Sequence, residues 1–504
     1  MLRNARIGMR PRHAAVAFAA VAVVGACLLL RSVPLANSAI IAASGAFFSR
    51  WLGRKAGGAF LGRVVLGSYL LIIVLAVALY AISALGLPLL AGLQLGGGFW
   101  TFAWDAPTYH AFAAEILDSW SGRAEFPQRE HLEYSVFTAS IYLVFGIHPL
   151  NAILANALFH SVVVASAFSL GQRASGTAAG RISALLVGFW PSLLLWSAQL
   201  LKDTLLLMFV FLLLDLAARG LDRQAFLNYR WLAKAAWWTG FFMLVLLTYR
   251  FRWYLVLFFA MALAVTLVVG AVINDAGYAG VRPATVLLLA TLAASVLAGH
   301  IGIHQSAARA HLPGDVKEQA TARRAPPPPD DRSVTRTVLP QIMDPLRSLN
   351  NVRRGSASSG GSLVDPDVQF KTVWDVILYL PRGVALALFS PFPSEWLQAA
   401  RTTGVFKAFA GVESVMMWAL LLPLVIGGVV AACSGRMESV LLLTWVGICA
   451  SFIAIAIANL GTLFRLRLEF LMPGMVLVGG GLEWLRSRLL ATGKGEPITD
   501  STVR

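Results

Sequence analysis

Asp105 stands where a carboxylate could act on a substrate close to a membrane surface. It lies in the run Phe102–His110, after an apolar segment and two residues before Pro107. A carboxylate in this position could act as a general base that takes a proton from an attacking hydroxyl or amine. It could equally cap a helix that begins at Pro107. Tyr109 and His110 follow in the same run and are the candidates for contact with the substrate.

Lys202 and Asp203 form a second charged pair between two apolar runs. The ordinary interpretation is a tight turn in which Asp203 caps the following helix. The functional alternative places Lys202 against a phosphate group, with Asp203 as its orienting partner at the catalytic centre. Both interpretations stay open at this point.

Basic residues recur at the ends of apolar segments that are expected to lie on the outer side of the membrane. The set comprises Lys202, Arg250, Arg252, Arg465 and Arg467, with Arg353, Arg354 and Arg382 in a long polar loop. The nearby acids, Asp105, Asp203 and Glu469, are fewer. Because the planar guanidinium fork matches phosphate oxygens, the set favours an anionic ligand. The alternative is that these side chains reach up to anionic lipid headgroups.

The composition identifies the environment in which these residues must work. Of 504 residues, 58% are apolar and 13% are charged, which excludes an ordinary soluble enzyme. The formal charge of +16 is explained first by membrane orientation, because short loops rich in Lys and Arg stay on the cytoplasmic side. No nucleic-acid partner is therefore expected. Cys27, Cys433 and Cys449 each lie in an apolar run and are predicted to be small buried side chains. No cofactor motif and no metal site is expected, and the loop histidines His110 and His131 have no partner at ligand spacing.

Apolar runs predict an all-α polytopic membrane protein with about twelve transmembrane helices, since a crossing needs about 20 apolar residues. Clear candidates are 14–30, 64–86, 149–171, 182–200, 235–249, 254–273, 284–301, 412–433, 438–459 and 469–485, and the shorter runs 34–48 and 203–217 complete the count. The run 14–30 is interpreted as an anchor, with a cleaved signal peptide as the alternative.

Counting from a cytoplasmic N-terminus places nearly all basic loops inside, including those with Arg54, Arg173, Arg219 and Arg436. Segments 134–147 and 374–392 then lie along the outer face, the second because prolines and Arg382 interrupt it. The predicted organisation is a basic N-terminal hairpin (1–63), a transmembrane catalytic core (64–301) with a first outer loop (96–135), a Pro-rich and polar outer loop (302–373), an outer-face helix with C-terminal crossings (374–486) and a cytoplasmic tail (487–504).

These motifs resemble the membrane glycosyltransferases of the C superfamily, particularly family 39-type enzymes. The likeness rests on Asp105 with Tyr109, on the helix Tyr134–Gly146, on Pro191 with Trp196-Ser197 leading to Lys202-Asp203, and on Gly461–Arg467 before the last apolar helix. It covers 96–275 well and 374–486 loosely. Two departures are Ala106, where the family often has an acid, and the loop 302–373, which lacks features of the mannosyltransferases.

The resemblance implies a polyprenyl-phosphate-linked sugar donor and Asp105 at the catalytic centre. By position, Lys202, Arg250, Arg252, Arg465 and Arg467 become candidates for the donor phosphate. The acceptor would be an envelope glycan, lipid or protein, and the site would lie on the extracytoplasmic face of the cell membrane. A polysaccharide polymerase or ligase would share this chemistry. A transporter or lipid flippase would place charges nearer the bilayer midplane, and a scaffold that catalyses nothing is a third alternative.

Overall fold

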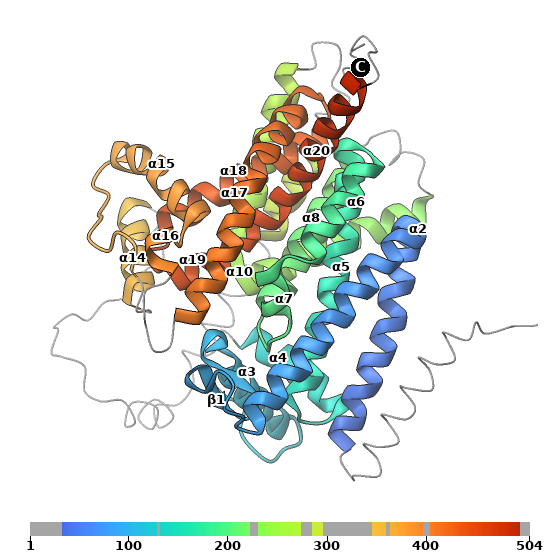
Figure 1. Ribbon diagram of the computed structural model, residues 1–504, viewed down its shortest axis with the longest axis vertical. Coiled ribbons are helices and arrows are strands. Elements are labelled where there is room, and N and C mark those ends of the chain that lie inside the picture. The colour runs from blue at the N-terminus through green and yellow to red at the C-terminus, as the bar shows by residue number, and fades with distance from the viewer. Residues whose placement is uncertain are drawn as a thin grey trace, which may run out of the picture.

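The computed structural model describes residues 33–128, 132–221, 230–273, 285–295, 345–358, 363–396 and 404–493 (Figure 1). Within these ranges the chain is almost entirely helical, which confirms the all-α prediction. The only sheet in the described part pairs the short antiparallel strands β1 (Gln94–Gly96) and β2 (Phe99–Trp100). Two 3-10 turns flank this ribbon, η1 (Ala91–Leu93) and η2 (Thr101–Ala103).

The described helices follow one another along the chain. They are α2 (Val33–Ala84), α3 (Ala106–Trp120), α4 (Glu133–Phe145), α5 (Pro149–Ser175), α6 (Thr177–Gly188), α7 (Pro191–Ser197), α8 (Asp203–Leu221), α10 (Trp231–Ile273), α14 (Pro345–Ser358), α15 (Val373–Phe389), α16 (Pro393–Trp396), α17 (Gly404–Cys433), α18 (Met437–Ala456), α19 (Leu460–Leu466) and α20 (Leu468–Gly493). A further apolar helix covers Thr285–Ser295.

Two of the long helices fold back on themselves. In α2 the backbone leaves helical geometry at Gly57 and Gly58, where Gly58 has φ +72°, a conformation that favours glycine. The two arms of α2 then run side by side (Figure 1), and the Tyr69 hydroxyl donates to the Ala42 carbonyl at 3.2 Å. The predicted segments 34–48 and 64–86 are therefore the arms of one hairpin.

The second fold-back lies in α10 at Arg252, whose φ is −153°. The rings of Phe241 and Phe259 lie 6.1 Å apart across it, a distance that a continuous helix would not allow. This break separates the predicted segments 235–249 and 254–273, and it leaves Arg252 at the tip of the turn.

Seven described helices are long and apolar enough to cross a membrane, or eight if the bent pair α6 and α7 forms one span. The predicted segment 182–200 is not one straight helix, because the chain bends by 56° at Pro191, which cannot continue the preceding helix. The segment 14–30 and both ends of 284–301 lie outside the described residues, so the total of twelve stays a prediction. The helix α15 within 374–392 is not among the candidate crossings.

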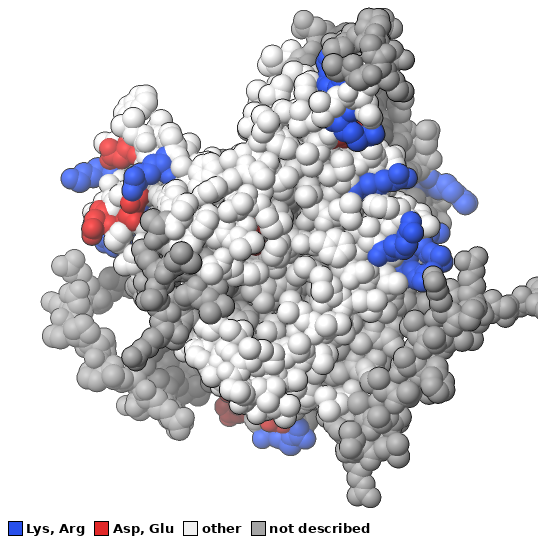
Figure 2. Space-filling model, viewed as in Figure 1, with Lys and Arg blue, Asp and Glu red and all other residues white. Residues whose placement is uncertain are grey.

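The most apolar windows of α5, α8 and α20 are 72%, 78% and 78% buried, whereas those of α2 and α17 are only 28% and 22% buried. The first three therefore form the centre of the bundle, and the others expose apolar side chains at its periphery. Figure 2 shows a broad surface with almost no charged side chains, and the Lys and Arg side chains in this view lie around its edges. A bilayer is the solvent that suits such a surface.

The cysteines differ in their burial. Cys449 is buried as predicted, but Cys433 is exposed, because it is the last residue of α17 and lies past the packed part of that helix. Cys27 lies outside the described residues.

Candidate functional site

Four segments that are distant in sequence bring charged side chains to one place. Asp105 precedes α3, Asp203 begins α8, Arg252 lies at the turn of α10, and Arg465 and Glu469 lie on α19 and α20. Each sits where a helix begins, breaks or ends, as expected for charges attached to apolar segments. We call these five residues the charge cluster.

Arg465 joins the two aspartates of the charge cluster. Its guanidinium donates from Nη1 to Asp105 Oδ2 at 2.9 Å and from Nη2 to Asp203 Oδ2 at 2.7 Å. The Asp105 side chain is 43% exposed, whereas that of Asp203 is 7% exposed. Asp105 is therefore the carboxylate of this pair that a substrate can reach.

Arg252 holds the inner side of the charge cluster. It donates to the second oxygen of Asp203 at 3.0 Å and to Glu469, whose Oε1 also accepts from the Tyr254 hydroxyl at 3.5 Å. Trp445 donates to the Glu469 carbonyl at 3.0 Å and fixes the start of α20. Asp203 is thus held from both sides by arginines, which explains how its charge is tolerated at 8% exposure.

Lys202 lies beside the charge cluster, half-buried at the start of α8. No ion pair or hydrogen bond of its ammonium group is found in the part of the chain that the structure describes. Burial lowers the pKa of Lys202, with Arg252 adding to the effect, while Asp203 and Asp105 oppose it. A nearby anion would favour the charged form of Lys202.

Capping by Asp105 is not observed, since its side chain makes no capping hydrogen bond to α3 and instead binds Arg465. The helix does begin beside Pro107, with Ala106 as its first residue. Asp203 is the first residue of α8, so its position also agrees with the turn interpretation.

Tyr109 lies next to the charge cluster and His110 does not join it. Burial, reinforced by the nearby charge of Asp105, raises the pKa of Tyr109, and its ring lies 4.9 Å from that of Tyr134. His110 instead hydrogen-bonds through Nδ1 with the Tyr142 hydroxyl at 2.7 Å, and burial lowers its pKa. The hydrogen-bond partner of His110 is therefore Tyr142 and not a carboxylate of the charge cluster.

Arg250 and Arg467 lie elsewhere, although each is only two residues from a member of the charge cluster. Arg250 pairs with Glu133 at 3.2 Å. Arg467 pairs with Glu413 at 2.6 Å, and the side chains of both are at most 1% exposed. Arg467 also donates to the Ser390 carbonyl, while Glu413 accepts from the backbone N–H of Ser192. Arg467 is a buried link between α17 and the start of α20, so it has no free face for a phosphate.

Glu413 and the pairing of Glu469 with Arg252 were not anticipated from the sequence. A single acid inside the apolar run 412–433 was the available signal, because an isolated buried carboxylate needs a cationic partner. Within the described residues, no group of three or more His, Cys, Asp or Glu side chains could hold a metal ion.

The arrangement provides one accessible carboxylate, Asp105, which binds Arg465 and lies near Lys202, and an inner support made of the ion pairs of Arg252. Asp105 can accept a proton, and Arg465 and Lys202 can donate hydrogen bonds to an anion. Together the fold and the charge cluster define a multi-pass α-helical membrane protein with a polar site at the ends of its helices.

No known family model matches this chain, and no curated protein is significantly similar to it. Among solved structures, an oligosaccharyltransferase, AglB from Archaeoglobus fulgidus in complex with an inhibitory peptide and a dolichol-phosphate, is similar at 12% identity and a TM-score of 0.38. The alignment covers 86% of this chain and 52% of that one, so this chain spans about half the length of that protein.

Proposed function

We propose that this protein is a membrane glycosyltransferase that moves a sugar from a polyprenyl-phosphate-linked donor to an envelope acceptor. The observation that carries the proposal is the ion pair of the half-exposed Asp105 with Arg465. Lys202 lies nearby, and its ammonium group has no ion pair among the described residues. A base next to anion-binding cations is what transfer from a phosphate-linked sugar requires.

Asp105 is the general base. As the acceptor hydroxyl or amine attacks the anomeric carbon, its proton passes to a carboxylate oxygen of Asp105. The bond between that carbon and the donor phosphate oxygen breaks, and the lipid phosphate leaves with the bonding electron pair. One displacement of this kind inverts the configuration at the anomeric carbon.

Lys202 and Arg465 stabilise the leaving phosphate. The ammonium group of Lys202 can donate hydrogen bonds to a phosphate oxygen. Arg465 can turn the N–H that binds Asp105 toward a phosphate oxygen, while its other N–H stays bound to Asp203. Arg252 and Glu469 do not touch the substrate in this scheme. They hold Asp203, and through it they hold Arg465 in place.

A lipid-linked donor suits the architecture. Transferases that use nucleotide sugars carry a soluble α/β domain, whereas the described residues contain only the two-stranded ribbon β1–β2 and helices. A donor dissolved in the bilayer brings its phosphate to headgroup depth, where helices begin and end.

The extracytoplasmic placement of the site is supported by the charges at the other helix ends. Asp203 begins α8, and Arg219 lies in its last turn. Arg173 lies in the last turn of α5, and Arg436 donates to its carbonyl at 3.0 Å. Because basic ends stay in the cytoplasm, the charge cluster belongs on the opposite face.

A deletion strain complemented with different variants tests this function. We expect the deletion to remove one glycan modification from the envelope and to raise the amount of a polyprenyl-phosphate sugar, both measured by mass spectrometry. Wild type and Asp118→Asn should restore the glycan, because Asp118 is an exposed carboxylate on α3 that pairs with Arg123. Restoration by Asp105→Asn, or an unchanged lipid-linked sugar pool, would contradict the proposal.

A further inference from the structure

A leucine-rich loop connects α2 to the strand β1. We call residues 85–95 the leucine loop, because they contain six leucines and have Gln94 as their one polar side chain. Leu93 is buried. The other five leucines are exposed, with Leu85 at 73% and Leu89 at 58%. Apolar side chains gathered in this way mark a contact with something other than water.

The exposed side chains of the leucine loop offer no polar group. The chain contains no Asp, Glu, Lys, Arg or His between Arg63 and Asp105. Gln94 turns its amide onto the backbone of the loop, where Nε2 donates to the carbonyls of Leu87 and Leu89 at 2.7 and 2.8 Å. A partner of this loop therefore meets leucine side chains and no charge.

The protein holds the leucine loop in place at both ends. The Ser83 hydroxyl donates to the Phe99 carbonyl at 2.8 Å, and the indole N–H of Trp100 donates to the Leu79 carbonyl at 3.1 Å. These bonds tie the ribbon β1–β2 to the end of α2 (Figure 1). Within the loop, Leu90 has φ +58°, a backbone conformation that leucine rarely adopts. A defined fold therefore presents the leucines outward, even with a strained backbone.

The leucine loop extends the exposed apolar side of α2. On the second arm of that helix, Leu71, Val74 and Val77 are also exposed. The arm from Val64 to Ala84 rises about 31 Å at 1.5 Å per residue, which is close to the thickness of the hydrocarbon core of a bilayer. The leucine loop therefore begins where α2 reaches the headgroups.

The chain beyond the leucine loop leads directly to the charge cluster. It passes through β2 and η2 to Trp104, whose side chain is 67% exposed, and then to Asp105. Tryptophan is enriched where membranes meet water. A leucine loop inserted at this depth would keep Asp105 close to the lipid headgroups.

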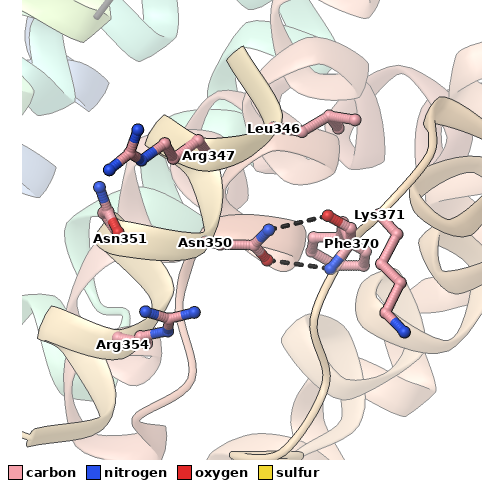
Figure 3. Close-up of a pocket in the computed structure, with 7 residues that line it drawn as sticks. All are labelled: Leu346, Arg347, Asn350, Asn351, Arg354, Phe370 and Lys371. Carbon is pink, nitrogen blue, oxygen red and sulfur yellow. Dashed lines mark hydrogen bonds between the residues drawn. The ribbon is translucent and has the colours of Figure 1, made fainter. Parts of the chain in front are cut away.

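A contrasting surface lies between α14 and the segment that leads into α15. Figure 3 shows a cavity there, of about 300 Å³, with polar and charged side chains around it. Asn351 is exposed and lies on the same wall as Arg347 and Arg354. Because such side chains lose free energy in lipid, Asn351 is a suitable water-exposed reference for the leucine loop.

We propose that the leucine loop inserts into the lipid leaflet on the side of the charge cluster, at the boundary between headgroups and acyl chains, and so keeps Asp105 at headgroup depth. Lipid fits this loop better than a protein partner does, because protein interfaces surround their apolar centre with polar side chains. The proposal does not depend on glycosyl transfer, since it rests on the exposed leucines, the lack of charge and the continuity with α2.

Depth-dependent fluorescence quenching in the full-length protein tests the proposal. The three natural cysteines are replaced with alanine, and a bimane label is attached to one new cysteine in each variant. The probes are Leu85→Cys, Leu89→Cys and Trp104→Cys. Val74→Cys, on the exposed side of α2, is the lipid-facing control, and Asn351→Cys is the water-exposed control.

The labelled proteins are placed in lipid nanodiscs, which leave both faces of the bilayer open to the solution. The quenchers are a lipid with a nitroxide near its headgroup, a lipid with a nitroxide near the end of its acyl chain, and iodide in the water. We expect the headgroup nitroxide to quench the labels at positions 85, 89 and 104 about twofold more strongly than the deep nitroxide does, because interfacial segments lie about 5–10 Å into the boundary. The label at position 74 should respond most to the deep nitroxide, and the label at position 351 to iodide.

Two results would overturn insertion of the leucine loop. Iodide quenching at positions 85 and 89 as strong as at position 351 would show that the loop lies in water. Protection of both positions from iodide and from both nitroxides would show that protein, such as a second copy of this chain, covers the loop. A label at position 104 that only iodide reaches would contradict the placement of Asp105. Unfolding temperatures identify any variant that does not fold, and positions 85 and 89 can each decide the test alone.

Discussion

Arg465 binds Asp105 across 360 residues of sequence, with 2.9 Å between Nη1 and Oδ2. The contact joins the loop before α3 to the end of α19. Because the same guanidinium also holds Asp203, the only strongly exposed carboxylate of the charge cluster is tied to its buried support. This one arginine therefore sets both the position of the proposed base and the charge beside it.

Replacing Arg465 with lysine should lower sugar transfer by about 10²-fold, although the positive charge is kept. A single ammonium lacks the planar fork that reaches Asp105 and Asp203 together. Transfer rates in membranes, normalised to the amount of folded protein, measure the effect. Arg123→Lys serves as the control and should retain full activity. Wild-type rates for Arg465→Lys would show that the bidentate contact is dispensable.

Lys202 should set the alkaline limit of activity. Burial lowers its pKa, so the ammonium loses its proton at lower pH than an ordinary lysine, and donor binding weakens as pH rises through that value. Lys202→Arg stays charged and should move the fall in activity to higher pH, whereas Lys55→Arg, an exposed change, should leave the profile alone. The profile of donor KM against pH measures this, and identical alkaline limbs for wild type and Lys202→Arg would exclude Lys202 from phosphate binding.

The Arg467–Glu413 pair should matter for stability. Arg467→Met leaves the Glu413 carboxylate buried without its partner and should cost about 3–5 kcal/mol of unfolding free energy. The double variant Arg467→Met with Glu413→Leu should recover much of that loss. Denaturation in detergent measures both. Arg486→Met breaks an exposed pair with Glu483 and should cost less than about 1 kcal/mol. A comparable loss for Arg486→Met would contradict the role of burial.

Close packing of α17 on α20 should depend on two glycines. A side chain added at Gly427 would meet the Leu477 carbonyl, and one at Gly481 would meet the Pro423 carbonyl, so the two backbones could not keep their distance. Valine at either position should lower the unfolding temperature clearly. Valine at Gly447 in α18, where nothing lies within 4 Å, should change it little. Equal effects at Gly447 and Gly481 would show that valine destabilises these helices without any contact between them.

The helices could be predicted from the sequence because apolar runs of sufficient length have no other stable place than a bilayer. The turns at Gly57–Gly58 and Arg252 fall in the gaps between predicted runs, so the sequence indicated where they lie. The bend at Pro191 lies inside the predicted run 182–200 and could not be located from hydropathy alone.

The site was predictable only in part, for a geometric reason. Arg465 and Arg467 are two residues apart, which on a helix turns their side chains by about 200°. One enters the charge cluster and the other binds Glu413, and the spacing alone cannot say which. Arg250 and Arg252 are also two residues apart, and the break of α10 at Arg252 gives them separate partners, Glu133 for Arg250 and Asp203 for Arg252. Asp105 and Asp203 could be singled out because they adjoin apolar segments, but their shared partner is a product of the tertiary fold.

The role of Asp105 as the general base is tested most directly by sugar transfer in isolated membranes that carry the Asp105→Asn variant and are supplied with the lipid-linked donor. Asparagine preserves the shape of the side chain but cannot take the proton. We therefore expect a loss of about 10²–10⁴-fold, with an unfolding temperature like that of wild type and full activity in Asp118→Asn. Transfer by Asp105→Asn at the wild-type rate would show that Asp105 is not the base.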